Sequence, residues 1–258
     1  MGALWNGLVD GLADFLRLLH TATQGVFGDF AWGWAIILLT FSVRLVLLPL
    51  AIKQTNSMRA MMKVQPEMKK IQAKYKVDRS MSKTNPDKYR ERKQKQQEAM
   101  MALYKEHKVN PLGSCLPLIL QAPILFALYR VLLSEVPEVR EAPFYLIDSL
   151  GATVRQGLAV AGIGVFLLLI VMAVTQYITQ KQMMSRQPSS SPEQAQQQKI
   201  MLYAMPAMIT IFGFNLPAGV LLYWVAQNVW MMVQQYVMFR SIEPLTAGTA
   251  GTAGPRKG

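Results

Sequence analysis

The sequence has very little of what covalent crosslinking, metal binding and catalysis require. Among its 258 residues there is one cysteine, Cys115, and there are two histidines, His20 and His107. A single cysteine excludes an internal disulfide framework and any CxxC metal or redox motif. No GxxxxGK[ST] phosphate loop, GxSxG nucleophile turn or HExxH metal motif occurs. We therefore expect neither an enzyme nor a cofactor.

Charged residues are also scarce, at 16% of the chain against 52% hydrophobic residues, which is unlike an ordinary soluble domain. Helices of about 20 apolar residues cross a bilayer, and the sequence predicts five of them. The first four stretches are 31–52, 109–134, 156–180 and 200–214, and the fifth runs to 239 after a turn sequence at 215–219. A soluble protein with five buried helices does not fit, because the chain is too short to cover them with a polar shell.

The excess of basic residues lies almost entirely in one segment. The formal charge of the chain is +12, and residues 53–108 contain 16 Lys and Arg against 6 Asp and Glu, a net +10. Because basic loops stay in the cytoplasm, this segment is predicted inside, with the amino terminus and the acid-leaning loop 135–155 outside. The predicted fold class is therefore an all-α integral membrane protein with five transmembrane helices, N-terminus out and C-terminus in.

Two segments outside the spans are also predicted to be helical. Residues 1–30 have leucines at helical spacing and predict an amphipathic helix lying in the outer interface, or one packed on the outer ends of the spans. Residues 53–108 predict a helical hairpin, 53–75 and 86–107, with Asn85 as N-cap and Pro86 at the first position. The remaining divisions are 31–52 for the first span, 109–240 for the other four, and 241–258 for a cytoplasmic tail.

Methionines are concentrated on this hairpin, and two interpretations of them stay open. They form a flexible apolar surface for varied partners, or they fill the core between the two helices. The seven residues are Met58, Met61, Met62, Met68, Met81, Met100 and Met101.

Arg44 is the most informative residue because it lies inside the first predicted span. No Asp or Glu occurs from Phe30 to Gln65 or in the other predicted spans, so the chain supplies no counterion there. A buried guanidinium without partners would cost several kcal/mol, on the order of the penalty for a buried ion. Its partners are therefore water, neutral polar groups, a lipid phosphate or an acidic group on a passing substrate. Polar side chains available to line such a pocket are Thr40, Gln121, Thr175, Gln176, Gln227 and Asn228.

Several motifs together resemble the YidC membrane-insertase family, which includes the mitochondrial Oxa and chloroplast Alb proteins. They are FSVR at 41–44, LYKEHKVNPLGSCLP at 103–117, QAPI at 121–124 and LPAGVLLYW at 216–224. The resemblance implies a five-helix core around a hydrophilic groove that is open to the cytoplasm and to lipid. It also implies that Arg44, Thr40 and Trp224 contact substrate. We expect a short bacterial form without the large extracytoplasmic domain, and with the basic tail reduced to a stretch around Arg256 and Lys257.

The predicted function is insertion and folding of membrane proteins in the bacterial cell membrane without nucleotide hydrolysis. The candidate groove residues are Arg44, Thr40, Gln121, Gln176, Trp224, Tyr223 and Gln227. The expected partners are nascent membrane proteins, the Sec translocon, the ribosome and anionic lipid headgroups, with no specific nucleic-acid site. The alternative is a small transporter or channel for anions, because an unpaired arginine in a polar cavity also fits that role.

Overall fold

The computed structural model describes residues 2–75, 84–109, 116–185 and 192–240. These residues form helices, and the part of the chain that is described contains no β-strand, only isolated bridges at Phe144–Ile147 and Thr153–Pro217. The α-helices are α1 (Gly2–Phe27), α2 (Ala31–Val46), α3 (Leu48–Lys74), α5 (Pro86–Glu106), α6 (Leu116–Arg130), α7 (Pro137–Glu141), α8 (Leu158–Ser185), α9 (Pro192–Gly213) and α10 (Ala218–Arg240). The all-α class is thus confirmed.

Two stretches of the described residues are long and apolar enough to cross a membrane by themselves. They are Gly2–Val46, which joins α1 to α2, and Ala161–Ser185 in α8. The five-span topology and its orientation remain predictions. Met81, Cys115, Arg256 and Lys257 lie outside the described residues, as does most of the predicted polar region between the two hairpin helices.

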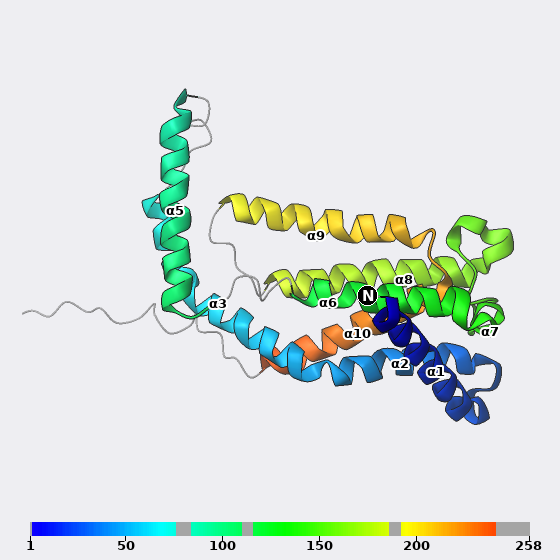
Figure 1. The fold of residues 1–258 in the computed structure, drawn as a ribbon. Coiled ribbons are helices and arrows are strands. Elements are labelled where there is room, and N and C mark those ends of the chain that lie inside the picture. The colour runs from blue at the N-terminus through cyan, green and yellow to red at the C-terminus, as the bar shows by residue number, and fades with distance from the viewer. Residues whose placement is uncertain (1, 76–83, 110–115, 186–191, 241–258) are drawn as a thin grey trace, which may run out of the picture.

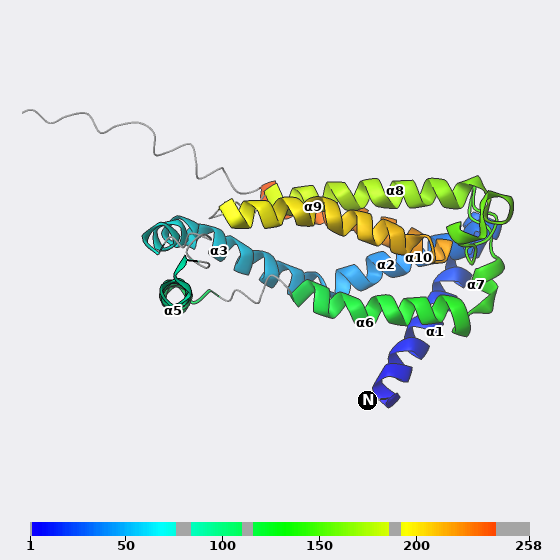
Figure 2. The ribbon, with the colours of Figure 1, turned by 90° about the horizontal axis from the view of Figure 1, so that it is seen from above.

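Five helices lie side by side in one bundle, as Figures 1 and 2 show for α2, α6, α8, α9 and α10. Helix α10 packs against α8 and α2, α9 packs against α8, and α1 crosses one end of the bundle against α2. A single apolar core runs through these contacts. Its fully buried side chains include Leu16, Ile36, Leu39, Leu128, Val165 and Leu221. The bundle has two distinct ends, because α1 and α7 lie at one and the hairpin of α3 and α5 projects from the other.

The first predicted span, 31–52, is divided between two helices. Helix α2 ends at Val46 and α3 begins at Leu48, with Pro49 in its first turn. Proline has no backbone N–H, so it cannot continue the α2 hydrogen-bond ladder to the carbonyl of Leu45, but it is well placed near the start of a new helix. Residues 48–52 therefore belong to the helix that leads into the hairpin. Arg44 then lies in the last turn of α2, where the helix dipole favours a cation.

The hairpin is built from α3 and α5. Helix α3 ends at Lys74 and α5 begins at Pro86, close to the predicted 75 and 86. The side chain of Asn85 accepts a hydrogen bond from the backbone N–H of Lys88 at 3.2 Å, which confirms it as the N-cap of α5. A side-chain contact also joins the two arms of the hairpin, with 3.2 Å between His107 Nε2 and Glu67 Oε2. The end of α3 and the start of α5 thus agree with the sequence pattern, whereas α3 begins at Leu48 rather than at Lys53.

A small apolar cluster between α3 and α5 accounts for three of the seven methionines. Val64, Met68, Leu103 and Val109 are buried in it, and Met61 and Met100 pack against its edge. These three methionines are core filler, whereas Met101 stays exposed. The hairpin consequently has its own core and a surface that is mostly charged.

At the opposite end, the loop between α7 and α8 is tied to neighbouring helices by its backbone. The N–H of Gly219 donates to the carbonyl of Leu150 at 2.8 Å, and the N–H of Ala218 donates to that of Ala152 at 2.9 Å. Both donors are at the start of α10, where backbone N–H groups have no partner within the helix. The loop therefore fixes the start of α10 against the rest of this end.

Helix α1 is packed on the bundle along one face. Val9, Ala13 and Leu16 are buried against the core, while Leu4 and Leu18 are exposed. This arrangement agrees with the packed alternative. It is also compatible with an exposed apolar face in the outer interface, which stays a prediction.

Gly164 provides a test of the close contact between α8 and the loop. A Cβ at this position would overlap the carbonyl oxygen of Leu146, whereas a Cβ at Gly25 in α1 would meet no atom within 4 Å. We expect Gly164→Ala to lower the midpoint of thermal unfolding in detergent, because overpacking costs about 1–3 kcal/mol. Gly25→Ala should leave it unchanged or raise it, since alanine favours a helix by about 1 kcal/mol. Equal midpoints for the two variants would contradict the packing described for the loop.

Candidate functional site

Arg44 is paired with a neutral amide. It is half-buried, and its Nη2 donates to Oε1 of Gln121 on α6 at 2.9 Å. Across the described ranges no carboxylate forms an ion pair with it. Only one guanidinium nitrogen makes this bond, so most of the donor capacity of Arg44 is not used by Gln121.

Gln121 connects Arg44 to a third helix. Its Nε2 donates to the hydroxyl of Tyr223 on α10 at 2.5 Å. Because the amide oxygen faces Arg44 and the amide nitrogen faces Tyr223, the two contacts fix the orientation of the amide. The three residues form a chain of hydrogen bonds across α2, α6 and α10.

A second set of polar contacts joins α10 to α8. The indole Nε1 of Trp224 donates to Oε1 of Gln176 at 3.1 Å, and Nδ2 of Asn228 donates to Oγ1 of Thr175 at 3.2 Å. Trp224 follows Tyr223 directly on α10, so the contact with Gln121 and the contact with Gln176 start from the same turn of this helix. Among the sequence candidates, the structure therefore brings Arg44, Gln121 and Tyr223 together, and separately Gln176 and Trp224.

Two other candidates lie in the same region with different roles. Thr40 is buried, and its hydroxyl donates to the carbonyl of Ile36 in its own helix at 2.7 Å. Gln227 is also buried, and its Oε1 has no hydrogen-bond partner among the described residues. A buried carbonyl oxygen without a donor is costly, so water or an incoming polar group would satisfy it.

On α2, α6, α8 and α10, the polar side chains lie nearer the hairpin than the buried leucines and valines of the same helix do. On α10, Val220 and Leu221 precede Tyr223 and Gln227, and on α2, Ile36 precedes Arg44. Helices α6 and α8 follow the same order, with their buried leucines and valines toward the α7 end. Toward the hairpin, the buried apolar side chains thus give way to polar ones, and we call this part of the bundle its polar half.

Sequence analysis missed Thr179 and Gln180 on α8, which are buried polar residues in the polar half. They follow Thr175 and Gln176 by four residues, and this helical spacing could have indicated that they share a face. The hydroxyl of Thr179 donates to the carbonyl of Thr175 at 2.8 Å.

The chemistry available at this site is charge and hydrogen bonding. It offers one cation, several amides and the hydroxyl of Tyr223. No group of three or more His, Cys, Asp or Glu that could hold a metal is found in the described ranges. Such a site can attract and solvate polar or acidic groups within an apolar bundle.

The sequence matches a known family over most of its length. The model of the 60Kd inner membrane protein family matches residues 22–245. The membrane protein insertase YidC of Streptomyces avermitilis is 36% identical over an aligned length of 253 residues. The match covers 86% of this chain and 55% of the relative. The protein of the same name from Syntrophobacter fumaroxidans is 40% identical over 211 residues, 80% of this chain and 34% of the relative. The chain thus spans between about a third and about half of the length of these relatives.

Gln121→Leu tests whether the polar half of the bundle is wet. It removes the acceptor of Arg44 and the donor to Tyr223. A hydrogen bond to a charged group is worth about 1.5–3 kcal/mol where nothing replaces it. Because Arg44 is half-buried, we expect water to take over, so the loss of unfolding free energy should be only about 1 kcal/mol in thermal unfolding. Gln94→Leu on the exposed face of α5 is the control and should change little. A loss of several kcal/mol at Gln121 would mean that the site is dry.

Proposed function

The chain belongs to the 60Kd inner membrane protein family, and on that premise we propose that it is a membrane protein insertase and chaperone of the bacterial plasma membrane. The family and its bacterial relatives support this location directly, and the resemblance found in the sequence is confirmed. The observation that carries the proposal is the pairing of Arg44 with the neutral Gln121 in an apolar bundle, where no carboxylate of the described residues forms an ion pair with Arg44.

We place α2, α6, α8, α9 and α10 across the membrane, with the hairpin on the cytoplasmic side. The net +10 of residues 53–108 supports this orientation, since basic segments are retained inside. The polar half of the bundle then faces the cytoplasm, and the half at the α7 end faces outward. Arg44, Gln121, Tyr223, Gln176, Trp224, Gln227 and Thr40 would line or support a groove in the inner part of the membrane.

The proposed mechanism is a shortened path through hydrocarbon. Carrying a hydrophilic tail across about 30 Å of hydrocarbon is costly. A wet groove in the inner half removes part of this distance, and the guanidinium of Arg44 offers a transient counter-charge to acidic groups. Gln121 can release Arg44 at little cost where water or an acidic group of the substrate takes over the hydrogen bond.

The energy for insertion would come from outside this chain. The sequence contains no GxxxxGK[ST] loop, and burial of the substrate's apolar segment in lipid, translation or the membrane potential can each drive the step. Nascent membrane proteins are the proposed substrates. The Sec translocon, the ribosome and anionic lipid headgroups remain proposed partners of the basic hairpin.

Substitutions at Arg44 test the role of its charge. In proteoliposomes that contain no other protein, Arg44→Ala should slow insertion of a short acidic-tailed test protein by about tenfold, or about 1.4 kcal/mol of barrier. Arg44→Lys should retain most of the rate, because a single hydrogen bond does not require the fork geometry of arginine.

Gln121→Glu is the matched test, because it keeps Arg44 but supplies the missing counterion. We expect it to slow insertion as Arg44→Ala does, while a tail without acidic residues should be affected little by either change. Wild-type rates for both variants would remove the charge of Arg44 from the mechanism. Anion conductance without insertion would favour the transporter alternative.

The hairpin yields a separate prediction. Deleting the residues between Gln65 and Met100 should slow recruitment of substrate while the bundle remains folded, because the hairpin has its own apolar cluster. Recruitment is measured as the lag before insertion in the same proteoliposomes, and folding as the thermal midpoint in detergent. Unchanged kinetics would reduce the hairpin to a connector.

A further inference from the structure

At the α7 end of the bundle, a tight turn presents apolar side chains away from the core. Phe144 and Ile147 exchange backbone hydrogen bonds of 2.8 and 3.0 Å, so Tyr145 and Leu146 form the tip. These two side chains are 58% and 66% exposed. Tyr145 has a φ of 52°, a conformation that is strained for a large residue. The turn thus holds an aromatic and a leucine outward at a cost.

Stacked aromatic rings hold this turn in place. The ring of Tyr145 stacks on Phe30, with centroids 4.7 Å apart, and its hydroxyl accepts a hydrogen bond from Nε1 of Trp34 at 3.3 Å. Trp34 in turn stacks on Phe27 at 4.7 Å. These rings come from the end of α1, the start of α2 and the turn. They therefore form one rigid aromatic group at a single level of the bundle.

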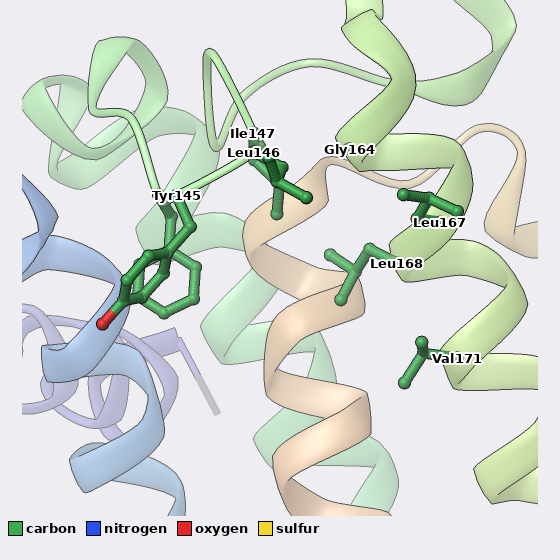
Figure 3. A pocket seen from close by; sticks show the side chains of 8 residues that line it. Tyr145, Leu146, Ile147, Gly164, Leu167, Leu168 and Val171 are labelled. Atoms are coloured by element: carbon green, nitrogen blue, oxygen red, sulfur yellow. The ribbon is translucent and has the colours of Figure 1, made fainter.

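Beside the tip is an open apolar depression, a surface cavity of about 200 Å³ between the turn and α8. Figure 3 shows the turn on one side and the α8 side chains on the other. It is lined by Phe144, Tyr145, Leu146, Ile147, Gly164, Leu167, Leu168 and Val171. The depression is open at the surface, and none of its lining residues is charged.

The surroundings of the cavity indicate what fills it. One wall of the depression is α8, whose stretch Ala161–Ser185 is apolar enough to cross a membrane. The neighbouring Ile163 and Ile170 are exposed on the same helix. The flanking loop 135–155 has four acidic residues against two arginines, so it would not select an anionic headgroup. The chemistry fits hydrocarbon rather than phosphate or a charged protein segment.

We propose that this surface, the tip of Tyr145 and Leu146 with the depression beside it, binds acyl chains of outer-leaflet phospholipids and fixes the depth of the bundle. Tryptophan and tyrosine rings favour the level between headgroups and hydrocarbon. Ten residues separate Trp34 from Arg44 along α2, which is about 15 Å of helix, or half of a hydrocarbon core of about 30 Å. The anchor therefore holds Arg44 near the middle of the membrane. The anchor rests on the membrane location and, for the choice of leaflet, on the orientation proposed above, but not on insertase activity.

Spin labels measure this directly in phosphatidylcholine vesicles. In a Cys115→Ser background, a nitroxide is attached through Leu146→Cys, Leu167→Cys or, as the control in the same loop, Glu141→Cys, whose native side chain is exposed. The ratio of collisions with oxygen, which dissolves in hydrocarbon, to collisions with a water-soluble nickel chelate reports depth. We expect this ratio at Leu146 and Leu167 to be several-fold higher than at Glu141. A ratio at Leu146 equal to the control would overturn the proposal, as would nickel-dominated collisions at Leu167.

A second variant separates the aromatic anchor from general exposure to lipid. Tyr145→Asn removes the ring but tolerates a positive φ, so the turn should keep its backbone shape. The ratio at Leu146 should then fall toward the control value, and an unchanged ratio would show that the ring does not set the depth. None of these readouts depends on insertion, so a failed insertion assay leaves this result intact.

Discussion

The guanidinium of Arg44 has no internal countercharge in the described structure, and the rest of the bundle is arranged around this constraint. A lone cation in an apolar bundle is costly, so it needs neutral acceptors and water. Gln121 supplies one acceptor, and its own orientation is fixed by the hydroxyl of Tyr223. Arg44 also lies in the last turn of α2. The carbonyl groups at the C-terminal end of a helix carry partial negative charge, so they stabilise a cation there. A carboxylate in place of Gln121 would satisfy the charge better, but it would also leave no free positive charge for an incoming acidic group.

The constraint is tolerable because the polar and apolar halves of the bundle are segregated. Toward the α7 end, the core is closed by side chains such as Leu128, Val165 and Leu221, and the loop before α8 is bonded to the start of α10. Toward the hairpin, amides and hydroxyls replace them. Water admitted to the polar half therefore meets a packed apolar layer. A site of this kind can be wet on one side and still belong to a stable bundle.

The helix break after Val46 connects this site to the hairpin. Since Pro49 ends the α2 ladder, α3 starts as a new helix and leads directly into the basic segment. The guanidinium of Arg59 on α3 donates to the carbonyl of Met238 in the last turn of α10 and lies over the ring of Phe239, with 5.5 Å to its centroid. The base of the hairpin is thus held by the same helix that carries Tyr223 and Trp224.

The sequence by itself predicted the helical class, the end of α3, the start of α5 with its cap at Asn85, and an arginine at position 44 without a nearby acidic residue. These depend on local pattern: hydrophobic runs, N-cap chemistry and the absence of acidic residues near an arginine. Only the tertiary structure decided that Arg44 pairs with Gln121, 77 residues away, that Thr40 bonds to its own helix, and that Met68 is buried while Met101 is not. The break at Pro49 was readable in principle, but a proline near the end of an apolar run is also compatible with one continuous span. Which amide meets which cation depends on the rotation and depth of each helix, and packing between distant segments sets both.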